Sequence, residues 1–474
     1  MTNGFICQNN PTGLAVVTHD GTHITYQQLL KDVHKSASFL FERELLFIVG
    51  ANDYPTLLFY LAALECGAVP LILSADVDAQ LLTNLINIYA PNKVLIGALP
   101  DSLSTQYEKC GQHAALSLFQ QVNPRSLEVH PDLGFLAATS GSTGAPKLVR
   151  LSVENLVENA KSISQYLEIA QDDRAMASLP ISYSYGLSII NSHLYAGGSI
   201  ILSNRSILEP EYWQSIRDHQ VTSFAGVPFH YEMLLRLRLE RLNVPSLRKM
   251  TQAGGKLKPT YIKKIYNSCR DLGIKFWTMY GQTEASPRIS YLAPEKTLDK
   301  LSSIGQAIPN GRLWVRNQEG EDISFTNQVG ELVYEGPNVC LGYAESEQDL
   351  SLGDVNDKRL NTGDLARCDE DGYFFIEGRM SRFLKIYGNR ISLDQVEKVV
   401  CAKGMECAAY GEDDHLWVSI VSENAEETEN LKLEIAKILG LNSKAITCVE
   451  TTDLPRMASG KVDYQCLKRA MQEA

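Results

Sequence analysis

The chain has 474 residues and a mass of 52.6 kDa, about three times the length of one compact domain, so we expect more than one core. Apolar residues make up 44% of it and charged residues 21%, a globular balance that excludes intrinsic disorder and collagen-like repeats. The net charge is −12 and there is no long basic run, so the composition argues against binding of nucleic acid.

Signals for membranes, secretion and disulfides are also not found. The longest apolar stretch, residues 57–64, is far shorter than a membrane span, and residues 1–10 lack the basic and apolar regions of a signal peptide. Ten cysteines are scattered without a CxxC pair, which is typical of reduced thiols and not of a zinc site. We therefore expect a cytoplasmic protein without a membrane span.

Short apolar runs alternate with helix-length segments over the first three hundred residues, which predicts parallel sheets built from βαβ units. The expected strands include 45–49, 68–73, 93–96, 134–138, 199–202 and 276–279, and the expected helices include 55–65, 153–167 and 259–272. Near residue 305 the rhythm changes to short strands such as 312–315 and 330–334, separated by Gly and polar turns, which indicates a small antiparallel section.

These patterns predict an α/β fold with two domains. The large N-terminal domain, residues 1–378, would hold the βα-built sheets and the antiparallel section. Residues 379–474 are enough for a small, mobile α+β C-terminal domain. No internal repeat or Pro-rich linker is visible, so the joint between the two must be short.

The first chemical signal is the segment TSGSTGAPK, which follows an expected strand. Its glycines let backbone N–H groups converge on an anion, and its hydroxyls and lysine suit phosphate oxygens. It differs from the Walker A loop, because Pro146 stands at the second glycine and Leu148 cannot ligate magnesium, so a P-loop kinase or ATPase is disfavoured. Taken alone, the segment is also compatible with a Ser/Gly-rich surface turn. The residues expected to bind phosphate are Thr139, Ser140, Gly141, Ser142, Thr143, Gly144 and Lys147.

Four further motifs follow in order: AGGKL at 253–257, YGQTE at 280–284, NTGD at 361–364 with GYF and GR at 372–379, and LPRMASGK at 454–461. With the Ser/Gly segment they resemble the motifs of the adenylate-forming superfamily, which holds acyl-CoA synthetases, peptide-synthetase adenylation domains and luciferases. The resemblance covers residues 20–465 and is closest to bacterial AMP-forming acyl-CoA ligases.

The resemblance implies a site that neutralises and aligns two anions, since a carboxylate must be joined to the α-phosphate of ATP. Glu284 would ligate Mg²⁺ and Thr283 would donate to the α-phosphate. Tyr280 would stack on adenine, and Thr278 stands where relatives often have an Asn that reads the adenine amine. Asp364, with Arg379 as its partner, would accept both ribose hydroxyls, and Gly254, Gly255, Gly281 and Gln282 would complete the nucleotide site. Alone, each residue also has an ordinary structural explanation.

The small domain would serve both half-reactions. The resemblance implies that Lys461 stabilises the transition state of adenylation. Ser381 stands at the hinge, where relatives usually have Asp or Lys, and rotation there would bring in Lys385 and Gly388 for thioester formation.

The acyl pocket is expected around Tyr183, Ser184, Gly254 and Met279. Amino-acid-activating relatives have Asp where this chain has Ser184, which disfavours an α-amino acid, and many CoA ligases have His in place of Tyr183. Arg288 is close enough in sequence to face this pocket and pair with a second carboxylate, although a surface salt bridge is the more ordinary expectation for an arginine.

We therefore predict an AMP-forming acid–thiol ligase that uses ATP and Mg²⁺. It would convert a small carboxylic acid to acyl-AMP with release of pyrophosphate, then pass the acyl group to CoA or to phosphopantetheine on an acyl carrier protein. One alternative is an amino- or aryl-acid adenylation enzyme that loads a carrier protein. Another is a catalytically silent nucleotide-binding regulator, although Lys461, Glu284 and Asp364 argue against silence.

Overall fold

The computed structural model describes residues 4–7, 9–138, 147–317, 319–323, 326–380, 382–387, 389–412, 414–422, 424–439, 441–457 and 461–472. The chain divides into two compact units, the first made of Met1–Leu313 and Tyr334–Leu360 and the second of Trp314–Val333 and Asn361–Ala474. The predicted domain boundary after residue 378 lies within the second unit's residues and stays a prediction. None of the helices in the described ranges is long and apolar enough to cross a membrane.

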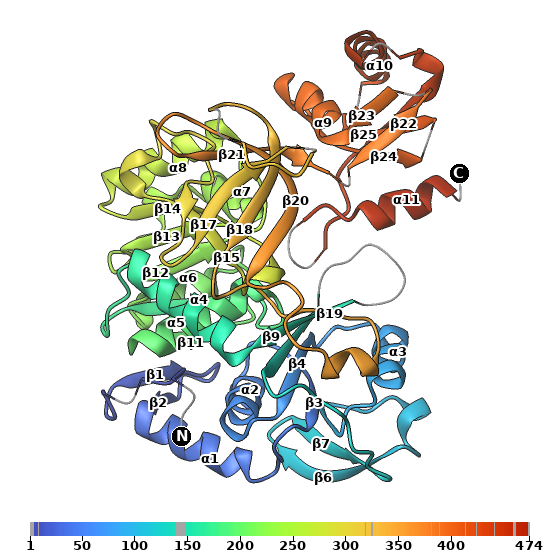
Figure 1. The fold of residues 1–474 in the computed structure, drawn as a ribbon. Helices are drawn as coiled ribbons and strands as arrows, with labels where there is room; N and C mark the ends of the chain where they lie inside the picture. The colour runs from blue at the N-terminus through green and yellow to red at the C-terminus, as the bar shows by residue number, and fades with distance from the viewer. Residues whose placement is uncertain are drawn as a thin grey trace. The chain divides into compact units, whose positions relative to one another are not determined.

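The first unit contains two large sheets (Figure 1). The nine-stranded sheet runs in the order β16 (Gln306–Ala307), β15 (Arg288–Leu292), β14 (Lys275–Gly281), β13 (Lys249–Gln252), β12 (Ser223–Gly226), β10 (Arg174–Ala177), β11 (Ser199–Leu202), β1 (Leu14–Val17) and β2 (His23–Thr25). From β14 to β1 neighbouring strands are parallel, while β15, β16 and β2 are added antiparallel.

Alternate residues of the nine-stranded sheet enter two different cores, as the period-two pattern of strands requires. Met176, Phe224, Met250 and Phe276 pack with residues of α6 (Pro210–Asp218), α7 (Pro228–Leu237) and α8 (Pro259–Asp271) on one face. On the other face, strand residues such as Ala175 and Trp277 pack with α4 (Val153–Tyr166) and α5 (Ser184–Ala196).

The eight-stranded sheet has the order β19 (Gly342–Ala344), β9 (Leu148–Ser152), β8 (Leu133–Ala138), β4 (Val69–Ser74), β3 (Leu45–Gly50), β5 (Lys93–Ile96), β7 (Leu116–Gln121) and β6 (Tyr107–His113). Its central pairs, from β8 to β5, are parallel. Helix α2 (Tyr54–Cys66) packs with one set of β3 residues and α3 (Ala79–Tyr89) with the alternate set, while α1 (Tyr26–Ala37) lies against α2.

The four-stranded sheet β17 (Arg312–Arg316), β18 (Gly330–Glu335), β20 (Arg359–Cys368) and β21 (Phe374–Arg379) contains residues of both units. The second unit continues with the hairpin β22 (Phe383–Ile386) and β23 (Asn389–Ser392), then α9 (Leu393–Ala402), β24 (Glu406–Glu412), β25 (His415–Val421), α10 (Ala425–Leu439), β26 (Ile446–Thr451) and α11 (Tyr464–Gln472). Buried residues of α9, α10 and β24–β26 form a separate core. The predicted α/β class with a small α+β section is confirmed.

Candidate active site

Several predicted site residues lie where parallel strands of the nine-stranded sheet reach their carboxyl ends, the usual ligand edge of such sheets. Gly254 follows β13 with φ of +83°, and a Cβ there would come within 2.7 Å of the Tyr183 hydroxyl, so only glycine fits. Tyr183 caps α5, whose first residue, Ser184, has its Oγ 3.1 Å from Thr283 Oγ1. The structure thus brings the predicted acyl-pocket residues Tyr183, Ser184 and Gly254 next to the predicted α-phosphate ligand Thr283.

The end of β14 carries the residues predicted to hold adenine. Gln282 Nε2 donates to the Tyr280 hydroxyl at 3.0 Å, and Thr278 Oγ1 is buried without a hydrogen-bond partner among the described residues. A Cβ on Gly281 would approach Pro287 O at 2.0 Å, so glycine lets β15 return closely along β14. Met279 is buried and its Sδ accepts a hydrogen bond from Tyr166 at 3.0 Å, while Gly255 lies against Pro228.

Glu284 is positioned by a residue that the sequence did not point to. The Tyr343 hydroxyl, on β19, donates to Glu284 Oε1 at 2.8 Å, and Cys340 N donates to the Glu284 backbone carbonyl. Burial and the neighbouring carboxylate raise the pKa of Tyr343, which keeps this donor protonated. Lys147 Nζ lies 3.6 Å from the centroid of the Tyr343 ring and 3.7 Å from Glu345 Oε1, so a cation shares this corner of the site.

This corner fits a magnesium ion held mainly by substrate. Glu284 supplies one carboxylate, and no cluster of three or more His, Cys, Asp or Glu is found within the described ranges. Mg²⁺ keeps several waters and binds proteins through one or two carboxylates together with substrate phosphates, so one glutamate is an adequate protein ligand. Of the predicted phosphate loop, residues 139–147, all but Lys147 lie outside the described residues, between the paired residues Ala138 and Leu148.

The second unit brings together the predicted ribose pair. Arg379 Nε donates to Asp364 Oδ1 at 2.7 Å, across the register of β20 and β21, and Asp364 is buried. Lys385 on β22 and Lys461 before α11 are exposed, whereas Ser381 and Gly388 lie outside the described residues. The roles assigned to these residues stay predictions.

Arg288 begins β15, opposite Gly281, and is 3% exposed. Its Cζ lies 4.1 Å from the centroid of the Tyr185 ring, and it forms no ion pair with any carboxylate of the described chain. The expected surface salt bridge is therefore wrong, because the close return of β15 along β14 buries this side chain.

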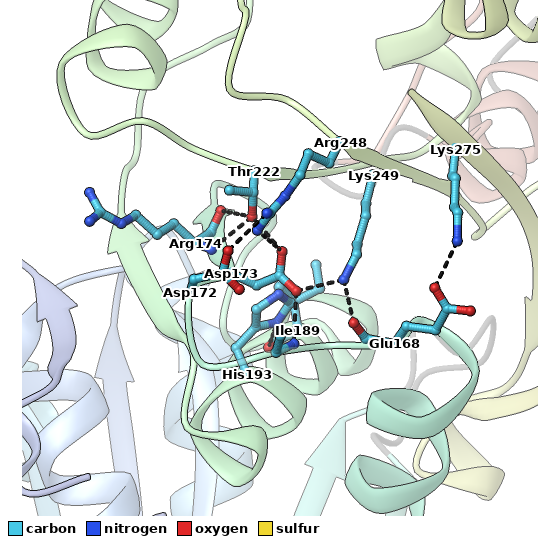
Figure 2. Close-up of polar contacts among 11 residues, drawn as sticks. Glu168, Asp172, Asp173, Arg174, Ile189, His193, Thr222, Arg248, Lys249 and Lys275 are labelled. Atoms are coloured by element: carbon cyan, nitrogen blue, oxygen red, sulfur yellow. Dashed lines mark hydrogen bonds and ion pairs between the residues drawn. The ribbon is translucent and has the colours of Figure 1, made fainter. Parts of the chain in front are cut away.

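A second polar cluster lies at the opposite edge, where β10, β12, β13 and β14 begin (Figure 2). Asp173, which is 1% exposed on its side chain, accepts from Lys249 Nζ at 2.5 Å, Arg248 at 2.9 Å and Thr222 Oγ1 at 2.9 Å. Although burial raises the pKa of Asp173, hydrogen bonds from the Ala170 N–H and from Lys249 bring it below the usual range. All contacts of this cluster are internal, as in a structural network.

Comparison with known proteins decides the family. A model of the AMP-binding enzyme family matches residues 6–344. The chain belongs to this family. The predicted relation to the adenylate-forming, AMP-binding enzymes is thereby confirmed.

Relatives of this AMP-binding enzyme include two kinds of CoA ligase. It is 26% identical to 2-succinylbenzoate–CoA ligase of Listeria innocua over 96% of both chains. It is 27% identical to indoleacetate–CoA ligase of Aromatoleum aromaticum over 72% of this chain and 68% of that one. Among solved structures, the ATP-bound RpMatB-BxBclM chimera B3 superposes with a TM-score of 0.79 at 22% identity, covering 100% and 99% of the two chains. The o-succinylbenzoate CoA synthetase of Bacillus subtilis with bound OSB-AMP gives 0.75 at 21%, covering 98% and 96%. These likenesses show a shared fold.

Proposed function

We propose that the site beside Thr283 joins a carboxylic acid to the α-phosphate of ATP and that CoA then receives the acyl group. In the first step a carboxylate oxygen attacks the α-phosphorus, and the bond from phosphorus to the departing pyrophosphate breaks. In the second step the CoA sulfur bonds to the acyl carbon, its proton leaves, and AMP departs with the carboxyl oxygen. The contact between Ser184 and Thr283 supports the proposal, because it joins a residue predicted to line the acyl pocket to the predicted phosphate ligand.

Residues near Thr283 would neutralise the negative charge of the ATP phosphates. Lys147 faces phosphate oxygens in this proposal, and Glu284, oriented by Tyr343, holds Mg²⁺. The bound metal would draw charge from the phosphate oxygens. Asp364 and Arg379 would bind ribose, and Lys461 would add its charge to the adenylation transition state. A solved relative holds ATP and magnesium, which supports both as cofactors here.

CoA is the favoured acceptor because the named relatives are CoA ligases. A carrier protein remains the second acceptor to test. An α-amino acid is a poor candidate substrate, since the hydroxyl of Ser184, beside Thr283, offers no charge to an α-ammonium group.

The experiment is pyrophosphate release from a panel of mono- and dicarboxylic acids, including indoleacetate and 2-succinylbenzoate, with CoA added or omitted. We expect acyl-AMP without CoA and the thioester with it. Lys461→Ala and Glu284→Gln should each lower adenylation roughly 10²–10³-fold, whereas the exposed control Glu295→Gln should not. Pyrophosphate release that no acid stimulates, or a Lys461→Ala enzyme of normal rate, would overturn the proposal.

A further inference from the structure

Arg288 is a buried positive charge at the ligand edge of the sheet. It is 3% exposed, and its guanidinium carries a positive charge. Its Nε is buried and donates no hydrogen bond to any described residue. An uncompensated charge in a protein interior is costly, so the absence of an ion-pair partner in the described chain requires an explanation.

The side chains around Arg288 do not neutralise it. Its Cζ lies 4.1 Å from the Tyr185 ring centroid, and its charge also acts on Tyr166 and Tyr183. Burial outweighs that charge and raises the pKa of Tyr166 to about 12, and it raises the pKa values of Tyr183 and Tyr185 as well. All three phenols are therefore neutral at physiological pH, and none of them supplies a negative charge.

Arg288 lines a cavity of about 20 Å³, room for about one water molecule. Ser188, Ser192 and His193 of α5 and Thr251 of β13 form other parts of its wall. His193 Nδ1 lies 2.9 Å from the Ile189 carbonyl and must donate to it, so Nε2 is an unpartnered acceptor (Figure 2). One water could accept from Arg288 and donate to His193, but a neutral water leaves the charge of Arg288 uncompensated.

Helix α5 connects this cavity to the reaction centre. Ser184, beside Thr283, and the cavity residues Ser188 and Ser192 are spaced four residues apart, so they lie on one helix face. One such step is a rise of about 6 Å. Ser184, beside Thr283, and Ser188, in the cavity wall with Arg288, are therefore about 6 Å apart along the helix axis, a separation that a short carbon chain spans.

We propose that Arg288 binds a second carboxylate of the acid, so that the enzyme activates short dicarboxylic acids. This inference rests on the proposed adenylation function. Arg288 pairs with the distal carboxylate while the other carboxylate is adenylated, and neutral Tyr166, Tyr183 and Tyr185 complete the surroundings of the ion pair.

The test compares matched acids on the wild-type enzyme by pyrophosphate release. Succinate, glutarate and adipate are each measured against their monomethyl esters, which keep one reacting carboxylate and lose the distal charge. We expect the best diacid to exceed its ester by roughly 100-fold in kcat/KM, because the ester leaves the guanidinium buried and unpaired. If the esters or simple monoacids are the better substrates, this inference is wrong while the adenylation function stands. If no acid stimulates pyrophosphate release, the adenylation function itself fails.

Two variants of Arg288 separate recognition from structure. Arg288→Met should lose the preference for the diacid and accept the monomethyl ester at least as well as the diacid, whereas Arg288→Lys should retain part of the preference. The exposed Arg236→Met on α7 is the matched control and should behave as wild type. A folded Arg288→Met enzyme with an unchanged ratio of diacid to ester would overturn the inference.

Discussion

Two buried charges on the nine-stranded sheet differ in whether the described chain supplies an ion-pair partner. At the amino edge the Asp173 carboxylate accepts from Lys249, Arg248, Thr222 and the Ala170 N–H (Figure 2). At the carboxyl edge Arg288 is almost as deeply buried, yet none of the described carboxylates pairs with it.

The difference separates charges that serve the fold from charges that serve a ligand. A network closed on itself stabilises the sheet and has no remaining capacity for substrate. A buried cation without a counterion is tolerated where a bound anion completes it. We therefore expect substitutions at the amino edge to change stability and substitutions at the carboxyl edge to change activity.

The largest expected effect is at the amino edge. Asp173→Ala leaves Lys249 buried without its carboxylate and should lower the free energy of unfolding by about 3–5 kcal/mol, measured by urea denaturation. The control Asp172→Ala removes only an exposed partner of Arg248 and should cost less than about 1 kcal/mol. Similar losses of unfolding free energy in the two variants would contradict the assignment of the buried Asp173 network to the stability of the fold.

Lowering the pH should decrease the free energy of unfolding through His193, which lies next to the cluster around Asp173. Burial lowers the pKa of this imidazole to about 4, against about 6.5 in an unfolded chain. Between these pKa values the unfolded state binds a proton that the native state does not. The free energy of unfolding therefore has its full value above pH 6.5 and falls as the pH drops toward 4. His193→Gln should reduce the slope of unfolding free energy against pH by about 1.4 kcal/mol per unit near pH 5. A slope equal to that of the wild type would mean that His193 is not buried as a neutral group.

At the carboxyl edge, Tyr343→Phe removes the hydrogen bond to Glu284 but keeps the ring beside Lys147. The loss of one such bond to a carboxylate should lower adenylation by about tenfold and raise the magnesium concentration needed for half-maximal rate. Unfolding free energy should change by less than about 1 kcal/mol. Tyr107→Phe on β6, which removes a buried hydrogen bond to the Pro91 carbonyl, is the control and should leave the magnesium dependence unchanged.

The smallest expected change is the stability of Arg288→Met. Replacing an uncompensated buried cation with an apolar side chain of similar length should leave the unfolding free energy equal to that of the wild type or higher. A loss above about 2 kcal/mol, comparable to that of Asp173→Ala, would assign Arg288 to the fold and not to a ligand.

The sequence predicted strands best where a short apolar run is bounded by turn residues. The predicted strands 93–96 and 199–202 coincide with β5 and β11. A short apolar run bounded by turns is typical of a strand buried inside a parallel sheet. The hairpin β6–β7 was missed, since β6 is largely exposed and polar and carries no apolar alternation. Thr283 and Ser184 could be named from the resemblance of their segments to family motifs, and the structure places their hydroxyls 3.1 Å apart.

Contacts between distant strands could not be predicted in this way. Tyr343 is 59 residues from Glu284, and only the pairing of β19 with β9 brings its strand into the sheet beside the site. The burial of Arg288 depends on the close return of β15 along β14 at Gly281, a tertiary feature that a single sequence does not display.

Binding of a stable acyl-adenylate mimic tests the central claim most directly. An acyl-sulfamoyl adenosine with a glutaryl group would be titrated calorimetrically into the wild-type enzyme, alongside the same compound with its distal carboxylate methylated. We predict that the free carboxylate binds roughly 100-fold more tightly and that Arg288→Met removes the difference. Equal affinity of the two compounds for the wild-type enzyme, or tighter binding of the ester, would contradict the assignment of Arg288 to a second carboxylate.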